Sequence, residues 1–391
     1  MEIEYWWLLV LPLFFGLGWF AARIDIKQLL SESRALPLGY FKGLNFLLNE
    51  QPDKAIEAFI EVVKVDPQTI ELHFALGGLF RRRGEVERAI RMHQNLVERP
   101  DLASEQKLMA LFELAQDYFK AGLLDRAEEL FLKLETTSYA EQALRFLLEI
   151  YEQEKDWHKA IGIAGKLETV TGRSHQKEVA NFCCELALNE LMHTRPEAAR
   201  PHLAQALAHH RTCVRANMLL GDLEIAAKRP EAAIEAWMRI ESQNPQYLAL
   251  VAERLFNAYK QRGKLEEGVN LLRGYLNKYP SLDLLNVVFQ GTLESQGTEP
   301  AYRLARDELR RMPTLLGLDK LLEAQMMEAP LDRRRDLELV KELVNQHTRS
   351  LAMYKCDNCG FRARQYYWHC PACAAWETYS PRRTEEAKLP A

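Results

Sequence analysis

Four cysteines near the end of the chain have the spacing of a metal site. Cys356 and Cys359 form one C-x-x-C pair, and Cys370 and Cys373 form a second pair after a gap of ten residues. Four thiolates are the number that a tetrahedral metal ion requires. A redox pair of the thioredoxin type is the alternative, but two adjacent pairs without a βαβ pattern do not suit it. We therefore predict a metal site with these four cysteines as ligands.

The residues leave the metal open between iron and zinc, because both accept tetrahedral thiolate ligation. The paired knuckles look rubredoxin-like, which favours iron. Gly360 follows the first pair, where the turn often needs a positive φ, but Ala374 stands at the equivalent place after the second pair. The gap between the pairs is also shorter than in free-standing rubredoxins. These departures argue against electron transfer, so we expect a structural site in a module that folds only with its metal.

The rest of the chain offers no catalytic constellation. We find no Gly-x-Ser-x-Gly, no His-Glu-x-x-His, no phosphate loop and no dinucleotide-binding turn, so we predict that the chain is not an enzyme. Cys183, Cys184 and Cys213 lie in helical patterns and are interpreted as small buried residues. This cysteine usage suits a reducing compartment. The net charge of −4 gives no overall attraction to nucleic acid.

The module must be positioned by a long series of paired helices. In the stretch Leu76–Ile90, LGGLFRRRGEVERAI, Gly84 separates two short helical patterns whose small residues, Gly77 and Ala89, permit close approach. Similar patterns recur at steps of 33 to 39 residues, which is typical of tetratricopeptide (TPR) repeats. The small residue of each second helix marks the repeats: Ala55, Ala89, Ala127, Ala160, Ala199, Ala233, Gly268 and Ala301. We predict an all-α TPR superhelix with a concave surface.

Two parts of the array are less regular. In the fifth repeat, Asn189 and Glu190 stand where an aromatic residue is expected, and His202 interrupts the apolar period. The basic cluster around Arg81–Arg83 is interpreted as a solvated turn, with a site for an acidic partner as the alternative. After Pro313, residues 315–348 are typical of one more helical pair, which would cap the array.

The N-terminus carries a stretch that is long enough to span a membrane. Tyr5–Ala22 contains 18 residues without charge, or about 27 Å of helix. A cleavable signal peptide is the alternative, but Glu2 and Glu4 precede the stretch where such peptides carry basic residues. The basic residues Arg23, Lys27 and Arg34 follow it, which places the remainder in the cytoplasm by the positive-inside rule. We therefore predict a single N-terminal transmembrane helix.

These features divide the chain into six predicted segments. They are an anchor at 1–22, a linker at 23–35, a TPR array of about eight repeats at 36–313, capping helices at 314–350, a rubredoxin-like four-cysteine module at 351–380 and a flexible tail at 381–391.

The order of anchor, repeats and metal module resembles the lipopolysaccharide assembly protein B family of Gram-negative bacteria. The resemblance covers the whole chain, and its most specific stretches are GLNFLL at Gly43–Leu48, LFRRRGEVERAIRMHQ at 79–94 and YKCDNCGF…YWHCPACAAW at 354–376. The resemblance implies a single-pass inner-membrane protein with a periplasmic N-terminus and a cytoplasmic array. It also implies that the module packs against the repeats, with Cys356, Cys359, Cys370 and Cys373 as metal ligands.

The resemblance further implies an adaptor that regulates lipopolysaccharide synthesis. Such an adaptor promotes degradation of the lipid A pathway deacetylase by the membrane protease FtsH, and it coordinates other lipopolysaccharide assembly proteins at the inner membrane. Two other classes stay open from the residues. The basic and aromatic tail is compatible with a zinc ribbon that binds nucleic acid, although we expect no nucleic acid for a membrane-attached chain. A redox enzyme that uses the metal is the other. Homo-oligomerisation is left open.

Overall fold

The computed structural model describes residue 19 and residues 38–65, 70–348 and 351–386. Except for Trp19, the predicted anchor at 1–22 lies outside these residues, as does the whole predicted linker at 23–35. In the part of the chain that is described, no helix is both long and apolar enough to cross a membrane.

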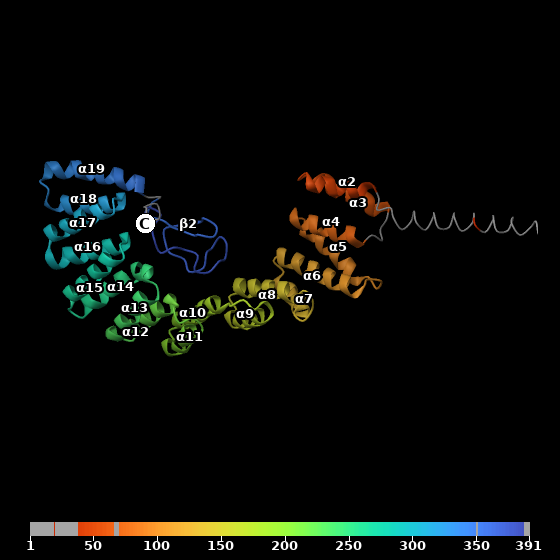
Figure 1. The fold of residues 1–391 in the computed structure, drawn as a ribbon, viewed down its shortest axis with the longest axis horizontal. Coiled ribbons are helices and arrows are strands. Elements are labelled where there is room, and N and C mark those ends of the chain that lie inside the picture. Colours follow the sequence, from red (N-terminus) through yellow and green to blue (C-terminus); the bar gives the residue numbers. More distant parts are fainter. Residues whose placement is uncertain (1–18, 20–37, 66–69, 349–350, 387–391) are drawn as a thin grey trace, which may run out of the picture. The chain divides into compact units, whose positions relative to one another are not determined.

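The described residues are almost entirely α-helical, and the chain divides into two compact units between Glu154 and Lys155 (Figure 1). The helices of the first unit are α2 (Leu38–Leu48), α3 (Pro52–Val65), α4 (Ile70–Arg82), α5 (Val86–Glu98), α6 (Ser104–Lys120), α7 (Leu124–Leu134) and α8 (Ala140–Glu154).

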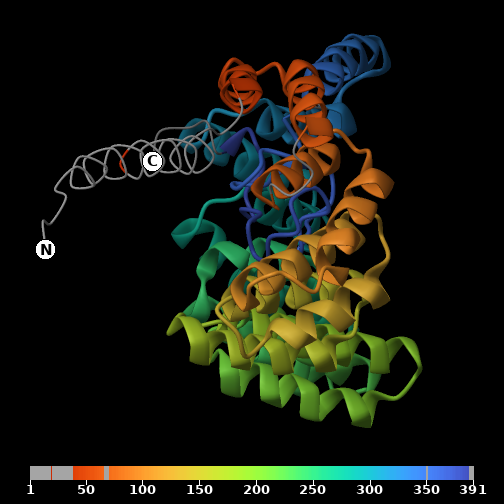
Figure 2. The same cartoon turned by 90° about the vertical axis from the view of Figure 1, so that its right-hand side faces the viewer.

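The second unit holds the remaining helices and the two short strands. Its elements are α9 (Trp157–Thr171), α10 (Gln176–Met192), α11 (Pro196–His209), α12 (Val214–Ala226), α13 (Pro230–Gln243), the 3-10 helix η2 (Pro245–Tyr247), α14 (Leu248–Gln261), α15 (Leu265–Lys278), α16 (Leu282–Gln296), α17 (Thr298–Arg311), α18 (Leu315–Glu328), α19 (Leu331–Thr348), β1 (Tyr354–Lys355) and β2 (Arg362–Ala363). Successive helices such as α10 and α11, or α12 and α13, pack as pairs (Figure 2).

The small residues that mark the repeats in the sequence lie at closely packed positions. All seven marker alanines have fully buried side chains, and Gly268 is buried as well. Each marker falls in the second helix of its predicted pair, from Ala55 in α3 to Ala301 in α17. At Gly77 in α4, an added Cβ would lie 2.3 Å from the His93 ring of α5. The predicted all-α, TPR-like repeat fold is therefore confirmed.

From the pair α2–α3 to the pair α14–α15, each turn between paired helices contains a residue with a positive φ. After α4, Gly84 has a φ of +80°, and the N–H of Glu85 donates to the carbonyl of Phe80 at 2.9 Å. This six-to-one bond closes a Schellman motif, which needs a left-handed residue after the helix. After α12, Lys228 adopts the same left-handed conformation with a φ of +57°. The repeat therefore constrains backbone geometry even where glycine is missing.

The fifth pair, which looks irregular in the sequence, contains a helix buried on more than one side. In α10, the run from Val179 to Cys184 is buried without interruption. A helix with a single apolar stripe would not bury consecutive residues, so α10 must have neighbours on several faces. The predicted burial of Cys183, Cys184 and Cys213 is confirmed.

The last helical pair covers the end of the array with one helix and exposes the other. Ala324 of α18 packs into a cluster with Phe289, Ala301 and Ala305. In α19, by contrast, Thr348 is the only buried residue among those described. The apolar side chains of Leu331, Leu339 and Leu343 remain at least half exposed. The covering of the array end thus comes from α18.

Candidate metal centre

The four cysteines of the C-terminal module lie together as a tetrahedral site requires. Their Sγ atoms are all within 4.8 Å of one another. The Sγ atoms of Cys356 and Cys373 are 3.8 Å apart, and those of Cys359 and Cys370 are 3.7 Å apart. A tetrahedron with metal–sulfur bonds of about 2.3 Å has edges of about 3.8 Å. The residues therefore fit a four-coordinate metal ion, without distinguishing iron from zinc.

The two knuckles have matching backbones. The N–H of Gly360 donates to the carbonyl of Cys356, and the N–H of Ala374 donates to that of Cys370, each at 2.9 Å. The residue after each pair is left-handed, with a φ of +79° at Gly360 and +53° at Ala374. Such a conformation costs a non-glycine residue roughly 1 to 2 kcal/mol. The second knuckle therefore carries backbone strain that the first avoids.

Polar groups around the sulfurs favour the thiolate form that binds metal. Burial opposes ionisation of Cys356, but the Thr378 hydroxyl and the backbone N–H groups of Cys359 and Asn358 lower the pKa of its thiol to about 6. The side-chain amide of Asn358 donates to the Cys373 sulfur at 3.4 Å and lowers the pKa of that thiol. Each knuckle thus contains one cysteine that is held toward its ionised state.

A small core supports the knuckles. The strands β1 and β2 pair antiparallel, with Tyr354 opposite Ala363. Tyr354 and Tyr379 are buried with Cys356 and Cys370 in one cluster. A site with four protein ligands has no open coordination position, which is the arrangement of structural metal centres.

Arg215 at the start of α12 attaches this module to the repeats. Its guanidinium carbon lies 5.9 Å from the Trp368 ring and 5.7 Å from the Trp376 ring, both in the module. The same guanidinium donates to Glu185 of α10 at 2.5 Å. Only 5% of Arg215 is exposed, so this cation is desolvated between two aromatic faces and a carboxylate.

Aromatic stacking extends the contact along the repeats. The Trp376 ring meets the rings of Trp157 in α9 and Phe182 in α10 edge-on, at centroid distances of 6.0 and 5.7 Å. The Trp368 ring stacks on Tyr247 of η2 with 10° between the ring planes. The module therefore supplies the neighbour that accounts for the continuous burial along α10.

Residues 381–386, which follow the module, accept hydrogen bonds from the first residues of α16 and α18. Where the sequence predicts a flexible tail, the described residues 381–386 are hydrogen-bonded to the array. The Glu385 carboxylate accepts the N–H groups of Leu315 and Leu316 at the start of α18, and Glu386 accepts the N–H of Leu282 at the start of α16. Carboxylates at helix N-termini satisfy donors that have no partner inside the helix.

Asp283 gathers two further contacts at the start of α16. It accepts a hydrogen bond from the Tyr354 hydroxyl at 2.8 Å and ion-pairs with Arg383 at 3.0 Å. The Arg383 guanidinium also lies over the Tyr354 ring at 4.0 Å. The module is thereby fixed to α16 through both its first strand and its final segment.

The structure brings the four predicted cysteines together, and it also shows contacts around them that the sequence did not predict. Arg215 and Asp283 were not singled out, because polar residues on helices give no signal for a contact made far along the chain. The continuous burial of α10, visible as its weak apolar period, was the one indirect sign.

The basic cluster at the turn between α4 and α5 is largely neutralised within the first unit. Arg81 pairs with Glu113 at 2.6 Å and with Asp117 at 2.8 Å. Arg83 pairs with Asp53 at 2.8 Å. Most of this cluster therefore serves internal contacts.

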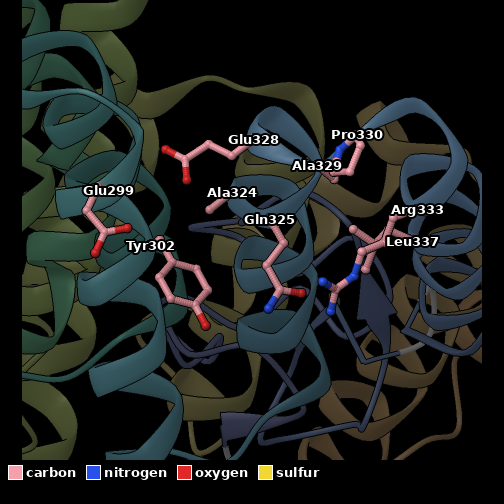
Figure 3. A pocket seen from close by; sticks show the side chains of 9 residues that line it. All are labelled: Glu299, Tyr302, Ala324, Gln325, Glu328, Ala329, Pro330, Arg333 and Leu337. Carbon is pink, nitrogen blue, oxygen red and sulfur yellow. The ribbon is translucent and has the colours of Figure 1, made fainter.

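A separate cavity of about 240 Å³ lies among α17, α18 and α19 (Figure 3). Tyr302, Gln325 and Arg333 line it together with the carboxylates of Glu299 and Glu328. Glu299 is paired with Arg303 at 2.8 Å. In the described part of the chain, the only group of metal-ligating side chains that comes together is that of the four cysteines.

Comparisons with known proteins agree with both parts of the fold. Residues 354–381 match a family model described as a rubredoxin metal binding domain, and residues 42–99 and 184–247 match a tetratricopeptide repeat model. Lipopolysaccharide assembly protein B of Escherichia coli K12 is 35% identical over 96% of this chain and 97% of its own length. The protein of that name from Haemophilus influenzae is 32% identical over 97% of this chain and 98% of its own length.

Proposed function

The chain belongs to the lipopolysaccharide assembly protein B family, and we propose that it is a membrane-tethered cytoplasmic adaptor that regulates lipopolysaccharide synthesis. In this proposal it presents the lipid A pathway deacetylase to the membrane protease FtsH for degradation. It also gathers other lipopolysaccharide assembly proteins at the inner membrane. The chain supplies binding surfaces and performs no chemical step itself.

The observation that carries the proposal is the attachment of the metal module to the repeats. Arg215, Trp376 and Asp283 make contacts of the kind that join two parts into one rigid body. The Trp368 face that a nucleic acid would need is stacked on Tyr247. A module used in this way supports a scaffold, and helical repeats are suited to holding proteins.

The proposed division of labour follows the chain. The apolar stretch Tyr5–Ala22 is the single-pass anchor, with the N-terminus periplasmic and the linker at 23–35 and the array cytoplasmic. Tethering raises the effective concentration of a bound client near a membrane protease to the order of mM. The array at 36–313 holds partners, the pair at 314–350 caps it, and the module at 351–380 stabilises the far end.

We also propose that Cys356, Cys359, Cys370 and Cys373 bind iron in the cell. The metal would supply the cross-link that holds the two knuckles, and the chain's own thiolates, Thr378 and Asn358 would keep it in place. Elemental analysis of protein purified at its natural expression level tests this. One iron per chain supports the proposal, and stoichiometric zinc contradicts it.

Crosslinking in living cells tests the adaptor proposal. A photoreactive residue is introduced on the repeats of the full chain and of a chain lacking residues 1–22, and the crosslinked proteins are identified. We expect the full chain to capture the deacetylase and FtsH, and the shortened chain to lose FtsH. Equal capture of FtsH without residues 1–22 would contradict the tethering.

The nucleic-acid alternative has its own test. A zinc ribbon that binds RNA by its basic and aromatic residues would show salt-dependent binding by the full chain in detergent. We expect no such binding, because Arg383 is paired with Asp283 and Trp368 is stacked on Tyr247.

A further inference from the structure

A groove on the first unit has the properties of a docking site. It has a volume of about 380 Å³ and is bordered by α2, α4 and α6, the first helices of three successive pairs (Figure 1). Leu47, Phe74 and Met109 contribute apolar surface to it. In the middle of α4, Gly78 lines the groove, and a Cβ built there would meet nothing within 4 Å. The groove therefore has open space above a helix backbone, where an incoming side chain could lie.

Two of the helices that border the groove, α4 and α6, are held at a fixed spacing by a polar network. Arg81 of α4 reaches across to Glu113 and Asp117 of α6. The second oxygen of Asp117 lies 2.5 Å from Nδ1 of His93 in α5. His93 and Asp117 are fully buried. A groove whose walls are tied in this way is preorganised, which lowers the entropic cost of binding.

The charges at the two ends of α4 indicate the chemistry of the occupant. Arg82 lines the groove and is exposed, and it has no ion-pair partner within the described residues, while its neighbour Arg81 is neutralised. Glu71, also exposed, lines the opposite end. Eleven residues of helix separate these two charges, or about 16 Å. An extended segment covers that distance in about five residues.

From these observations we infer that the groove binds a segment of a client protein that has a large apolar side chain between a basic and an acidic residue. The apolar side chain lies over Gly78, the acidic residue faces Arg82 and the basic residue faces Glu71. This inference rests on the proposed adaptor function, because it assigns the client to one part of the array.

Gly78 provides a test that leaves the fold unchanged. Gly78→Leu fills the groove, and it should be tolerated because the added side chain starts in open space and leucine favours helices. Gly274→Leu in α15 is the matched control, since Gly274 also has nothing within 4 Å of an added Cβ and does not line the groove. A thermal stability of both variants at or above that of the natural chain shows that neither substitution disturbs the fold.

The probe is a random peptide library displayed on phage and selected on the full chain in detergent. We expect the selected peptides to share an apolar residue flanked by opposite charges. Their affinity should fall at least about 10-fold in Gly78→Leu and stay unchanged in Gly274→Leu. Arg82→Glu should weaken them about five-fold, and replacing their acidic residue with lysine should restore binding to that variant.

Two outcomes would overturn the inference. One is a selection whose peptides bind Gly78→Leu as well as the natural chain. The other is a change in the molar mass of the particle in Gly78→Leu by light scattering, which would make the groove a contact between copies. If deacetylase turnover still depends on the chain in either case, the adaptor function stands and only this location is wrong.

Discussion

Two equivalent residues, Gly360 and Ala374, show how the metal knuckles use backbone geometry. Both follow a C-x-x-C pair, both donate to the first cysteine of that pair and both are left-handed. Glycine takes this conformation without a steric penalty, whereas alanine does not. The packing around the second knuckle therefore keeps Ala374 in a left-handed conformation that is unfavourable for alanine.

Exchanging these residue types should have opposite effects. Gly360→Ala is expected to destabilise the module by about 1 to 2 kcal/mol. Ala374→Gly should stabilise it by about 0.5 kcal/mol, because relief of strain is partly offset by the larger entropy of glycine in the unfolded chain. The measurement is the temperature at which the metal is released to a coloured chelator. A lower release temperature for Ala374→Gly would contradict the strain at this site.

The helices α10 and α12 act as the platform for the module. Asn181 of α10 donates to Glu377 at 2.9 Å, and Arg215 of α12 lies between Trp368 and Trp376. Asn181 and Arg215 are polar residues at buried positions, where a repeat helix would usually carry apolar side chains. The helices α10 and α12 therefore bind the module in addition to packing within the repeats.

Removing the Arg215 guanidinium should weaken the attachment of the module to the repeats while leaving its metal in place. Arg215→Ala removes the ion pair with Glu185 and leaves that carboxylate without its partner, so we expect a loss of roughly 2 kcal/mol. Amide hydrogen exchange around Trp376 should accelerate while the metal content stays constant. Arg310→Ala, at an exposed position of α17, is the control and should change exchange by little. Unchanged exchange in Arg215→Ala would argue against docking through this residue.

The start of α16 should show a pH dependence that comes from Glu386. Burial raises the pKa of its carboxyl, although the N–H groups of Leu282 and Arg383 act in the opposite direction. The folded chain therefore keeps this proton to a higher pH than the unfolded chain. The stability contributed by the group is present at low pH and is lost as the pH rises through the raised pKa.

Glu386→Gln removes this titration. The Tm of the natural chain minus that of Glu386→Gln should fall between about pH 4 and about pH 7. The same difference for Glu253→Gln, at an exposed position of α14, is the reference. If the Tm of the natural chain minus that of Glu386→Gln rises over this range, folding favours the ionised carboxylate, which would contradict the raised pKa.

At the scale of the whole molecule, local sequence patterns predicted the helices and the metal site. They did not predict contacts between residues far apart in the chain. The four cysteines lie within a stretch of 18 residues, and the marker residues recur every 33 to 39 residues, so both patterns could be recognised in the sequence. The bond from Asn181 to Glu377 spans 196 residues, and the one from Leu282 to Glu386 spans 104. Asparagine and glutamate are common on solvated surfaces, so no pattern distinguishes those that dock a module.

The central claim is that the metal module is part of a tethered adaptor for regulated proteolysis. The most direct test is the half-life of the lipid A pathway deacetylase in cells that carry the natural chain or its Cys356→Ser, Cys359→Ser double variant at equal abundance. We predict loss of metal, a lower thermal stability of the repeats and a deacetylase half-life several-fold longer in the variant. A variant that lacks metal yet keeps both the natural thermal stability and the natural deacetylase half-life would contradict the claim.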